Sequence, residues 1–514
     1  MLQFIEKYRE KAIAVLNGFD RIVFRGILRG LMHPDGMRLH LSRKDVPRRL
    51  YGQHVEETTS FLKAASLAEA TRLNRPVIYV PSSHQRKESL VREVLREHPV
   101  ETGLVCVLKC VEPCMTYEMY RNRDEKKLEL VYRLRKCLHL YHYFNDPLFG
   151  LMHARIQTWY PFPIQVCMNG REWLGRRLDE EGLDYTRYEN SFFRLEDPHR
   201  AQTLMNEFLR LDWPQQLNAI AARLNPVHQQ LLGNLRYYWF AHQTEWATDI
   251  VFDRPQDLQC IYPQLVWGAI TTFSSRDVMR FLGKQLQAPF KGEAVSHYEQ
   301  RPEGLRIKHG VNANSVKMYD KGGRILRVET TINNPHEIKV LRPKEAGEAG
   351  DILPRPLRKG VADLERRAHV SQRANERYLD ALSHLDTDIP LAQLLGPVTK
   401  RITRGGKRFR AVRPWDAADL PLLQAIHRPE YLLNGFRNRD IAALLFPQDP
   451  AHIETRRAAS GRTSYRLRIL HAHGLIAKIP RTRRYRITDK GRQICSAILL
   501  AQTATIKQLN VKAA

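Results

Sequence analysis

Strand-like and helix-like segments alternate along residues 1–340, and this alternation constrains the fold more than any other feature of the sequence. Runs of period two predict strands at 19–26, 76–80, 103–108, 154–168, 304–308, 315–319 and 325–332. Helical spacing predicts a helix that ends at Asn17-Gly18, helices within 171–225, and another over 231–251. We therefore expect the α+β class, with one large mixed α/β region, or two domains, built on an antiparallel sheet.

Residues 341–414 are expected to connect this region to the C-terminal part of the chain. The stretch 341–360 is rich in proline and glycine and has no periodicity, which is typical of a linker. A polar helix that could brace the two halves follows from Val361. The next stretch, GPVTKRITRGGKRFRAVRPW, is basic and interrupted by glycines, as expected of an arm that lies along nucleic-acid phosphates.

Residues 415–505 show helices, a glycine stop and then two strands joined by a turn. A helix that begins near Gly435 is followed by breaks at Pro447 and Pro450, a basic helix over 453–472, and the phrase HGLIAKIPRTRRYRITDKGRQ. This order predicts a winged helix-turn-helix. The phrase resembles the wing and last helix of MarR-like winged-helix domains, and the resemblance implies DNA binding.

The charge of the chain favours a polyanionic partner. Lys and Arg number 82 against 55 Asp and Glu, a formal net charge of +27, and residues 400–490 hold 21 Lys+Arg against 7 Asp+Glu, a balance of +14. No run of about 18 apolar residues occurs and the start lacks a signal-peptide pattern, so we expect no membrane partner and a cytoplasmic location.

The cations of the basic arm, the basic helix and the wing are the expected nucleic-acid contacts. They are Arg404, Lys407, Arg408, Arg410, Arg456, Arg457, Arg462, Arg466, Arg481, Arg483 and Arg484. DNA is the expected partner, and structured RNA stays open because phosphate contacts do not identify the sugar. The sequence leaves the oligomeric state open, with a homodimer as one option.

Residues 314–329 predict a hairpin whose strands are joined by a Gly-Gly turn. Alternation places Lys317 and Tyr319 on one face of the first strand, and Arg327 and Glu329 on one face of the second. Such a group could serve phosphodiester chemistry, with Tyr319 as nucleophile, Glu329 binding a divalent ion, and Lys317 and Arg327 neutralising developing charge.

The same hairpin is similar to the Tyr-Asp-Lys, then Arg-x-Glu, pattern of plasmid rolling-circle replication initiators of the replication-transfer type. That resemblance implies nicking of one strand through a tyrosyl-phosphate link at Tyr319, with a metal held by acids that include Asp20 of an early strand. The competing interpretation is a buried hairpin in which Arg327 and Glu329 neutralise each other.

Further carboxylates could complete a metal site. Glu245 and Asp249 are four residues apart and share one face of the expected helix, so with Glu329 and Asp20 they could hold Mg²⁺ or Mn²⁺. The alternative is that these acids are solvated. No phosphate-cradling glycine-rich motif occurs, so no nucleotide cofactor is expected.

Cys106, Cys110 and Cys114 are spaced by four residues, and Cys137 and His139 follow. Zinc clusters usually show closer pairs, so this spacing does not favour zinc.

Together these features predict three regions: a nucleic-acid-processing domain over 1–340, a linker, helix and basic arm over 341–414, and a winged helix-turn-helix over 415–505. The expected function is that of a mobile-element or plasmid-type protein that nicks or transfers a DNA strand at a site found by its winged helix. The alternative is a non-catalytic transcription regulator or a structural DNA- or RNA-binding protein.

Overall fold

The computed structural model describes residues 1–81, 85–271, 273, 275–283, 294–301, 304–343, 352–383, 390–428, 431, 435–446, 453–480 and 482–503. The chain divides into two compact units. Ala12–Phe252 and Ile325–Arg373 form one, here termed the sheet unit, and Met1–Lys11, Asp253–Arg324 and Ala374–Ala514 form the other, termed the C-terminal unit. Both contain helices and strands, so the expected α+β class is confirmed.

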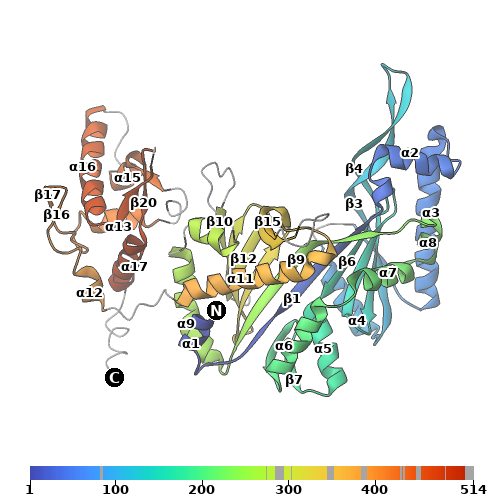
Figure 1. The fold of residues 1–514 in the computed structure, drawn as a ribbon, viewed down its shortest axis with the longest axis horizontal. Helices are drawn as coiled ribbons and strands as arrows, with labels where there is room; N and C mark the ends of the chain where they lie inside the picture. The colour runs from blue at the N-terminus through green and yellow to red at the C-terminus, as the bar shows by residue number, and fades with distance from the viewer. Residues whose placement is uncertain are drawn as a thin grey trace. The chain divides into compact units, whose positions relative to one another are not determined.

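The sheet unit is built on a mixed sheet in which the strands follow the order β13-β9-β1-β6-β5-β4-β3-β2. They are β1 (Ala12–Ile27), β2 (Val77–Val80), β3 (Gly103–Asn122), β4 (Lys127–Asp146), β5 (Gly150–Gln157), β6 (Ile164–Asn169), β9 (Tyr238–Phe252) and β13 (Ile325–Ile332). Neighbours are antiparallel, except that β2 and β3 are parallel. The long β1 pairs with β6 on one side and β9 on the other (Figure 1).

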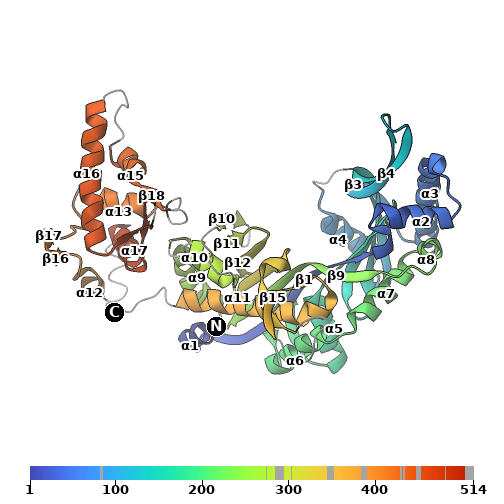
Figure 2. The same ribbon diagram turned by 45° about the horizontal axis from the view of Figure 1, so that its top comes forward.

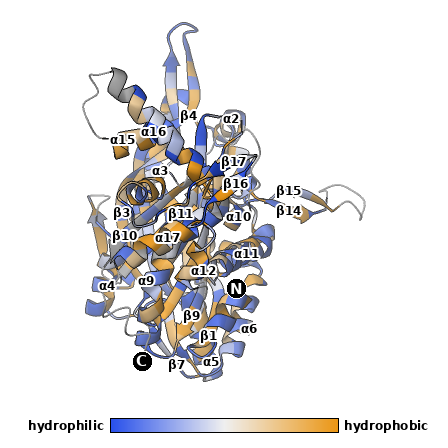
Figure 3. Cartoon of the chain, turned by 90° about the vertical axis from the view of Figure 1, so that its left-hand side faces the viewer, coloured by the Kyte–Doolittle hydropathy of each residue, from blue (hydrophilic) through white to orange (hydrophobic). Residues whose placement is uncertain are grey.

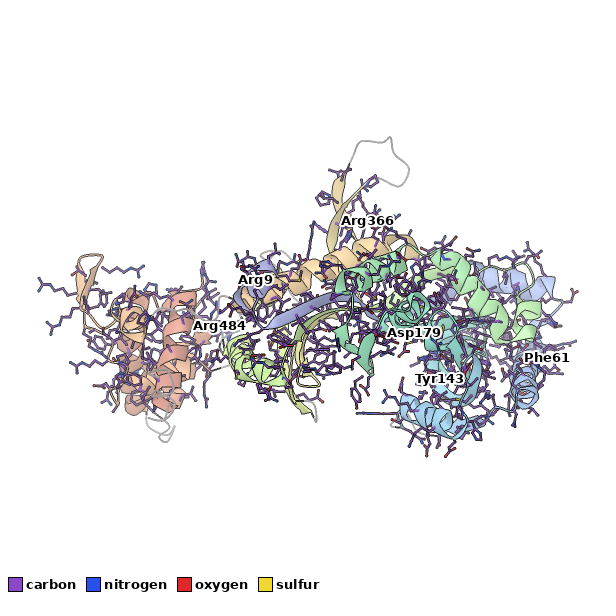
Figure 4. The ribbon with its side chains drawn as sticks, turned by 90° about the horizontal axis from the view of Figure 1, so that it is seen from below. Arg9, Phe61, Tyr143, Asp179, Arg366 and Arg484 are labelled. Atoms are coloured by element: carbon purple, nitrogen blue, oxygen red, sulfur yellow. The ribbon has the colours of Figure 1, made fainter. Side chains whose placement is uncertain are left out.

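Helices cover this sheet. They are α2 (Pro34–Arg43), α3 (Tyr51–Arg72), α4 (Lys87–Glu97), α5 (Gly170–Glu181), α6 (Pro198–Leu209), α7 (Trp213–Leu224) and α8 (Pro226–Leu232). Between α5 and α6, the chain forms a short strand pair, β7 (Tyr185–Tyr188) and β8 (Ser191–Leu195). The main core joins the middle strands to α5, α6 and α7 through residues such as Phe19, Trp173 and Phe208. A second core lies under α4, where Tyr143 packs (Figure 4).

The segment expected as a linker contains regular structure. β14 (Lys339–Arg342) and β15 (Leu353–Pro356) pair as a two-stranded projection (Figure 3), and residues 344–351 lie outside the described residues. The expected polar helix is present as α11 (Leu364–Ser383), which carries residues of both units. Asp363, just before α11, accepts a hydrogen bond of 2.7 Å from Arg366.

The C-terminal unit contains three neighbouring antiparallel strands, in the order β10-β11-β12, and the winged-helix elements. Its first elements are α1 (Leu2–Lys7), α9 (Pro255–Thr271), α10 (Ser275–Phe281), β10 (Ala294–Arg301), β11 (Gly304–Val311) and β12 (Asn314–Lys321). After α11 come α12 (Leu391–Leu395), β16 (Ile402–Arg404), β17 (Lys407–Phe409), α13 (Leu420–Ile426), β18 (Phe436–Arg437), α15 (Asn438–Leu445), α16 (Ile453–Ala472), β19 (Ile476–Lys478), β20 (Arg484–Ile487) and α17 (Asp489–Thr503).

The elements from α13 to α17 have the order and the three-stranded sheet, β18-β20-β19, of a winged helix-turn-helix. Helices α15 and α16 pack against each other, as Figure 2 shows, and Phe436, Ile441, Leu470 and Ile494 share their core. This part of the fold follows the sequence pattern closely.

One expected helix is shorter than predicted and another is mostly a strand. The N-terminal helix is α1, which ends at Lys7, and residues 12–17 belong to β1. Residues 238–251 belong to β9. In β1, Gly18 does not stop a helix: a Cβ atom there would meet Cε of Met205 on α6 at 2.0 Å, so glycine permits close packing. Pairing of these segments within the sheet overrides their local helical spacing.

Two other expectations differ in detail. The strand expected at 154–168 is two strands, β5 and β6. Helical structure within 171–225 is confirmed, but β7 and β8 interrupt it.

Candidate functional site

Three carboxylates meet on one face of the sheet unit. Asp20 on β1, Glu245 on β9 and Glu329 on β13 each offer an oxygen, and these atoms lie within 4.8 Å of one another. Three of the four acids expected as metal ligands are therefore brought together. We refer to Asp20, Glu245 and Glu329 as the acidic cluster.

Strand register explains how β9 and β13 present their acids together. Arg327 is opposite Asp249, and Thr331 is opposite Glu245, so Glu329 lies between these pairs on the same face. Glu245 and Asp249 do share a face, although on a strand and not on the expected helix.

A β-bulge brings Asp20 to the cluster. Phe19 is opposite Trp246 and Arg21 is opposite Glu245, which leaves Asp20 as the extra residue of β1. Its Oδ1 accepts hydrogen bonds from the side-chain amides of Asn169 at 3.2 Å and Asn190 at 2.6 Å. The bulge and these two amides fix the direction of the carboxylate.

Asp249, the fourth expected ligand, is engaged by arginines. Arg327 donates to its two oxygens at 2.5 and 2.8 Å, and Arg171 lies 3.1 Å from it. Both arginines are completely buried, and Arg327 also lies 3.3 Å from Asp20. Arg327 and Asp249 thus form a buried ion-pair network beside the acidic cluster.

The sequence did not identify three residues of this site: Asn169, Arg171 and Asn190. Asn169 also accepts a 2.7 Å hydrogen bond from the backbone N–H of Arg171 and so caps α5. The Asn-Gly-Arg at the start of a helical pattern was the available signal for this capping residue. No sequence signal marks Asn190, which lies in the β7–β8 turn.

Tyr319 and Lys317 lie on β12 and are both half-buried. They point to the same face of that strand, as expected. The glycines after the strand, Gly322 and Gly323, have φ of 64° and 77°, and Asp320 accepts a 3.0 Å hydrogen bond from the backbone N–H of Gly323. The expected strands and the Gly-Gly turn are therefore present, with Arg327 and Glu329 both buried on β13.

The exposed surface of α16 carries arginines. Arg457, Arg462 and Arg468 are exposed. Arg457 and Arg468, three turns apart, point the same way, whereas Arg462 lies about 140° around the helix axis from Arg457. Asn438 at the start of α15 holds this surface in place, since its amide donates to the hydroxyl of Ser464 at 2.7 Å.

Arg466 differs from its neighbours on α16. It donates to the carbonyl of Ala418 at 3.1 Å and lies over the ring of Phe446. It therefore contributes contacts within the winged helix. The side chain of Arg456 and the whole of Arg481 lie outside the described part of the chain.

The basic arm is a β-hairpin, β16–β17, with an exposed tip. Arg404, Lys407 and Arg408 are all exposed, and Arg404 also donates to the carbonyl of His471 at 2.9 Å. Arg410 pairs with Asp419 at 2.6 Å and so serves the packing of the hairpin. On the wing, Arg483 is exposed and Arg484 is half-buried.

Four of the seven cysteines fall into two groups. Cys106 and Cys110 pack in the core under α4. Cys114 lies instead beside Cys137 and His139. Burial, and next the charge of Arg155, lower the pKa of His139 to about 4, so its ring is neutral near pH 7.

Within the described part of the chain, no helix combines the length and the apolar character needed to cross a membrane. Comparisons with known proteins give no match to this chain, whether against family models, curated proteins or solved structures.

Proposed function

We propose that this protein binds DNA through its winged helix and cleaves one strand by metal-dependent phosphodiester chemistry in its N-terminal region. The observation that carries the binding part is the set of three exposed arginines on α16 within a helix-turn-helix. In such folds the second helix enters the major groove, where guanidinium groups contact guanine edges or phosphates. The exposed cations at the tip of the β16–β17 hairpin would neutralise further phosphates of the DNA backbone.

The acidic cluster supports the cleavage part. Its donors are all carboxylate oxygens, which is the ligand chemistry that Mg²⁺ and Mn²⁺ prefer. Asp20 and Glu329 are only 6% and 2% exposed, and Arg327 lies 3.3 Å from Asp20, so one guanidinium offsets part of the negative charge of the acidic cluster. A divalent ion would offset the remaining negative charge and polarise a bound phosphate.

Tyr319 is the proposed nucleophile on the strength of the Tyr-Asp-Lys resemblance. Its hydroxyl oxygen would form a bond to phosphorus while a phosphate–sugar bond of the strand breaks, leaving a protein-linked phosphate and a free sugar hydroxyl. Lys317, on the same face of β12, would neutralise charge on the phosphate. The non-catalytic alternative keeps the winged helix and assigns the buried carboxylates a structural role.

Charge on α16 should dominate the salt dependence of binding. Glutamine at Arg457, Arg462 and Arg468 together is expected to lower the slope of log K against log salt by about 1.8, since Arg457 and Arg468 would each contact a duplex phosphate and each such contact contributes roughly 0.9. Fluorescence anisotropy with a DNA duplex over a range of salt concentrations measures this slope, and an RNA duplex of equal length compares the two nucleic acids.

A matched triple variant tests whether position matters. Arg49, Arg96 and Arg210 are exposed in the sheet unit, and glutamine at these sites removes the same charge. Binding and slope should remain close to wild type. Equal losses in both triple variants would show that binding follows net charge alone.

Single arginine variants should separate three roles. Arg462→Ala is expected to reduce discrimination between DNA sequences, because a recognition helix contacts base edges. Arg483→Ala should weaken binding to all duplexes alike, because a wing contacts the backbone. Arg466→Ala should lower the melting temperature, because it removes the contacts to Phe446 and Ala418. Selection from a random duplex library, combined with thermal melting, measures all three, and uniform losses across sequences for Arg462→Ala would refute the assignment.

A further inference from the structure

Three soft metal-binding side chains converge in the interior of the sheet unit. Cys114 on β3 and Cys137 and His139 on β4 each offer a donor atom, and these atoms lie within 4.8 Å of one another. Their exposed fractions are 8%, 3% and 1%. We refer to these three residues as the thiol–imidazole cluster.

Strand pairing creates this cluster. Glu112 is opposite Cys137 in the antiparallel ladder of β3 and β4, so Cys114, two residues further, is a diagonal neighbour of Cys137. Cys137 and His139 are two residues apart and share a face of β4. The two sulfurs are 2.9 Å apart, which is longer than the roughly 2.05 Å of a disulfide bond.

The histidine ring is set in the tautomer that a metal needs. His139 Nδ1 lies 3.2 Å from the backbone carbonyl oxygen of Cys137. A carbonyl oxygen only accepts hydrogen bonds, so Nδ1 carries the hydrogen and Nε2 carries the lone pair. Metal-binding histidines are commonly oriented by this kind of second hydrogen bond.

We propose that Cys114, Cys137 and His139 bind a zinc ion, with solvent completing a tetrahedral site. Two thiolates and a neutral imidazole form a donor set that suits zinc far better than magnesium. Tetrahedral zinc with bonds of about 2.3 Å holds two sulfurs roughly 3.8 Å apart. The two sulfurs, 2.9 Å apart without the ion, would therefore have to separate on zinc binding by rotation about the Cα–Cβ bonds of the cysteines.

The third donor distinguishes this site from a simple pair of thiols. A disulfide would use the two sulfurs and leave His139 without a role in the cluster. Charges nearby also suit two thiolates: Glu112 on the same face of β3 is already paired with Lys87 and Arg155 at 3.0 Å each. The carboxylate is thereby neutralised beside the cluster.

The position of the cluster gives the ion a structural task. β2 pairs with β3 only as far as Cys110, and β5 pairs with β4 only from His139 onward. Beyond these points β3 and β4 continue as a two-stranded ribbon, which both Figure 1 and Figure 2 show extending past α2. Zinc would clamp the two strands where the sheet narrows, and two-stranded ribbons gain most from such a clamp.

Metal analysis of the full-length protein tests this inference. Protein purified with zinc is expected to hold about one zinc ion per chain after removal of free metal, and cobalt exchange should give thiolate-to-cobalt charge-transfer absorption. Cys114→Ser and Cys137→Ser should each weaken zinc binding by at least about 100-fold. Removal of zinc should lower the melting temperature of wild-type protein by several degrees.

Matched variants exclude other sources of zinc binding. Cys106→Ala, on the same strand, and the exposed Cys260→Ser should keep the zinc. Glu329→Gln should keep it too, because the acidic cluster is a separate site, so loss of cleavage activity and loss of zinc are independent results. If Cys114→Ser fails to fold, cobalt titration of the wild type still decides. Wild-type protein without charge-transfer absorption, or a Cys114–Cys137 disulfide that persists with excess zinc, would overturn the proposal.

Discussion

Glutamine in place of Glu329 is expected to reduce metal-dependent DNA cleavage by at least about 100-fold, because it removes one charged ligand from the ion that polarises the phosphate. Glutamine has almost the same shape, so the fold should persist. Arg327 remains held by Asp249 and Asp20 in this variant. The melting temperature should therefore change little, whereas Mn²⁺ should raise it in the wild type and no longer do so in the variant.

Two further glutamine variants make this result specific. Glu245→Gln removes another member of the acidic cluster and should reduce cleavage in the same way. Glu118→Gln lies in the sheet unit outside the cluster, where the carboxylate pairs with Arg133 at 2.7 Å, and it should cleave like wild type. Full cleavage by Glu329→Gln and Glu245→Gln would leave the carboxylates with the structural role of the alternative function.

Methionine in place of Arg327 should cause the largest loss of stability. The arginine is completely buried and donates to both oxygens of Asp249. Its removal leaves two buried carboxylates, Asp249 and Asp20, with less positive charge, and breaking a buried pair in this way costs roughly 3–5 kcal/mol. Five of the seven tryptophans, at 159, 173, 213, 239 and 246, lie in the sheet unit, so urea unfolding followed by tryptophan fluorescence reports on this unit.

Arg133→Met provides the matched control. This arginine pairs with Glu118 near the surface, where such pairs contribute up to about 1 kcal/mol. If the urea concentration at the unfolding midpoint is the same for Arg327→Met and Arg133→Met, this result would contradict the view that Arg327 organises the buried network.

The sequence pattern predicted those parts of the fold in which local signals and tertiary packing agree. The strands over 315–319 and 325–332 have clear alternation and a Gly-Gly turn, and both are present. The winged helix is likewise marked by local glycines and prolines. In contrast, residues 238–251 have helical spacing but become a strand, because hydrogen bonds to β1 and β13 on both sides determine their structure.

The candidate sites also depend on tertiary pairing that local sequence patterns do not reveal. Glu245 and Asp249 share a face despite the wrong secondary structure, since a separation of four residues returns to the same side in a helix and in a strand. The grouping of Asp20 with them depends on a bulge that alternation does not reveal. The thiol–imidazole cluster depends on the register between β3 and β4, and the spacing of residues along one strand does not determine that register.

The most direct test of the proposed function is a search for a covalent protein–DNA product. Purified full-length protein is incubated with labelled supercoiled and single-stranded DNA in the presence of Mg²⁺ or Mn²⁺, and a denaturing gel separates the products. Wild-type protein should yield a nicked strand and a labelled protein band, and Tyr319→Phe should yield neither while binding DNA normally. A Tyr319→Phe protein that forms the product as well as wild type, or a wild-type protein that leaves the DNA intact with either metal, would contradict the account.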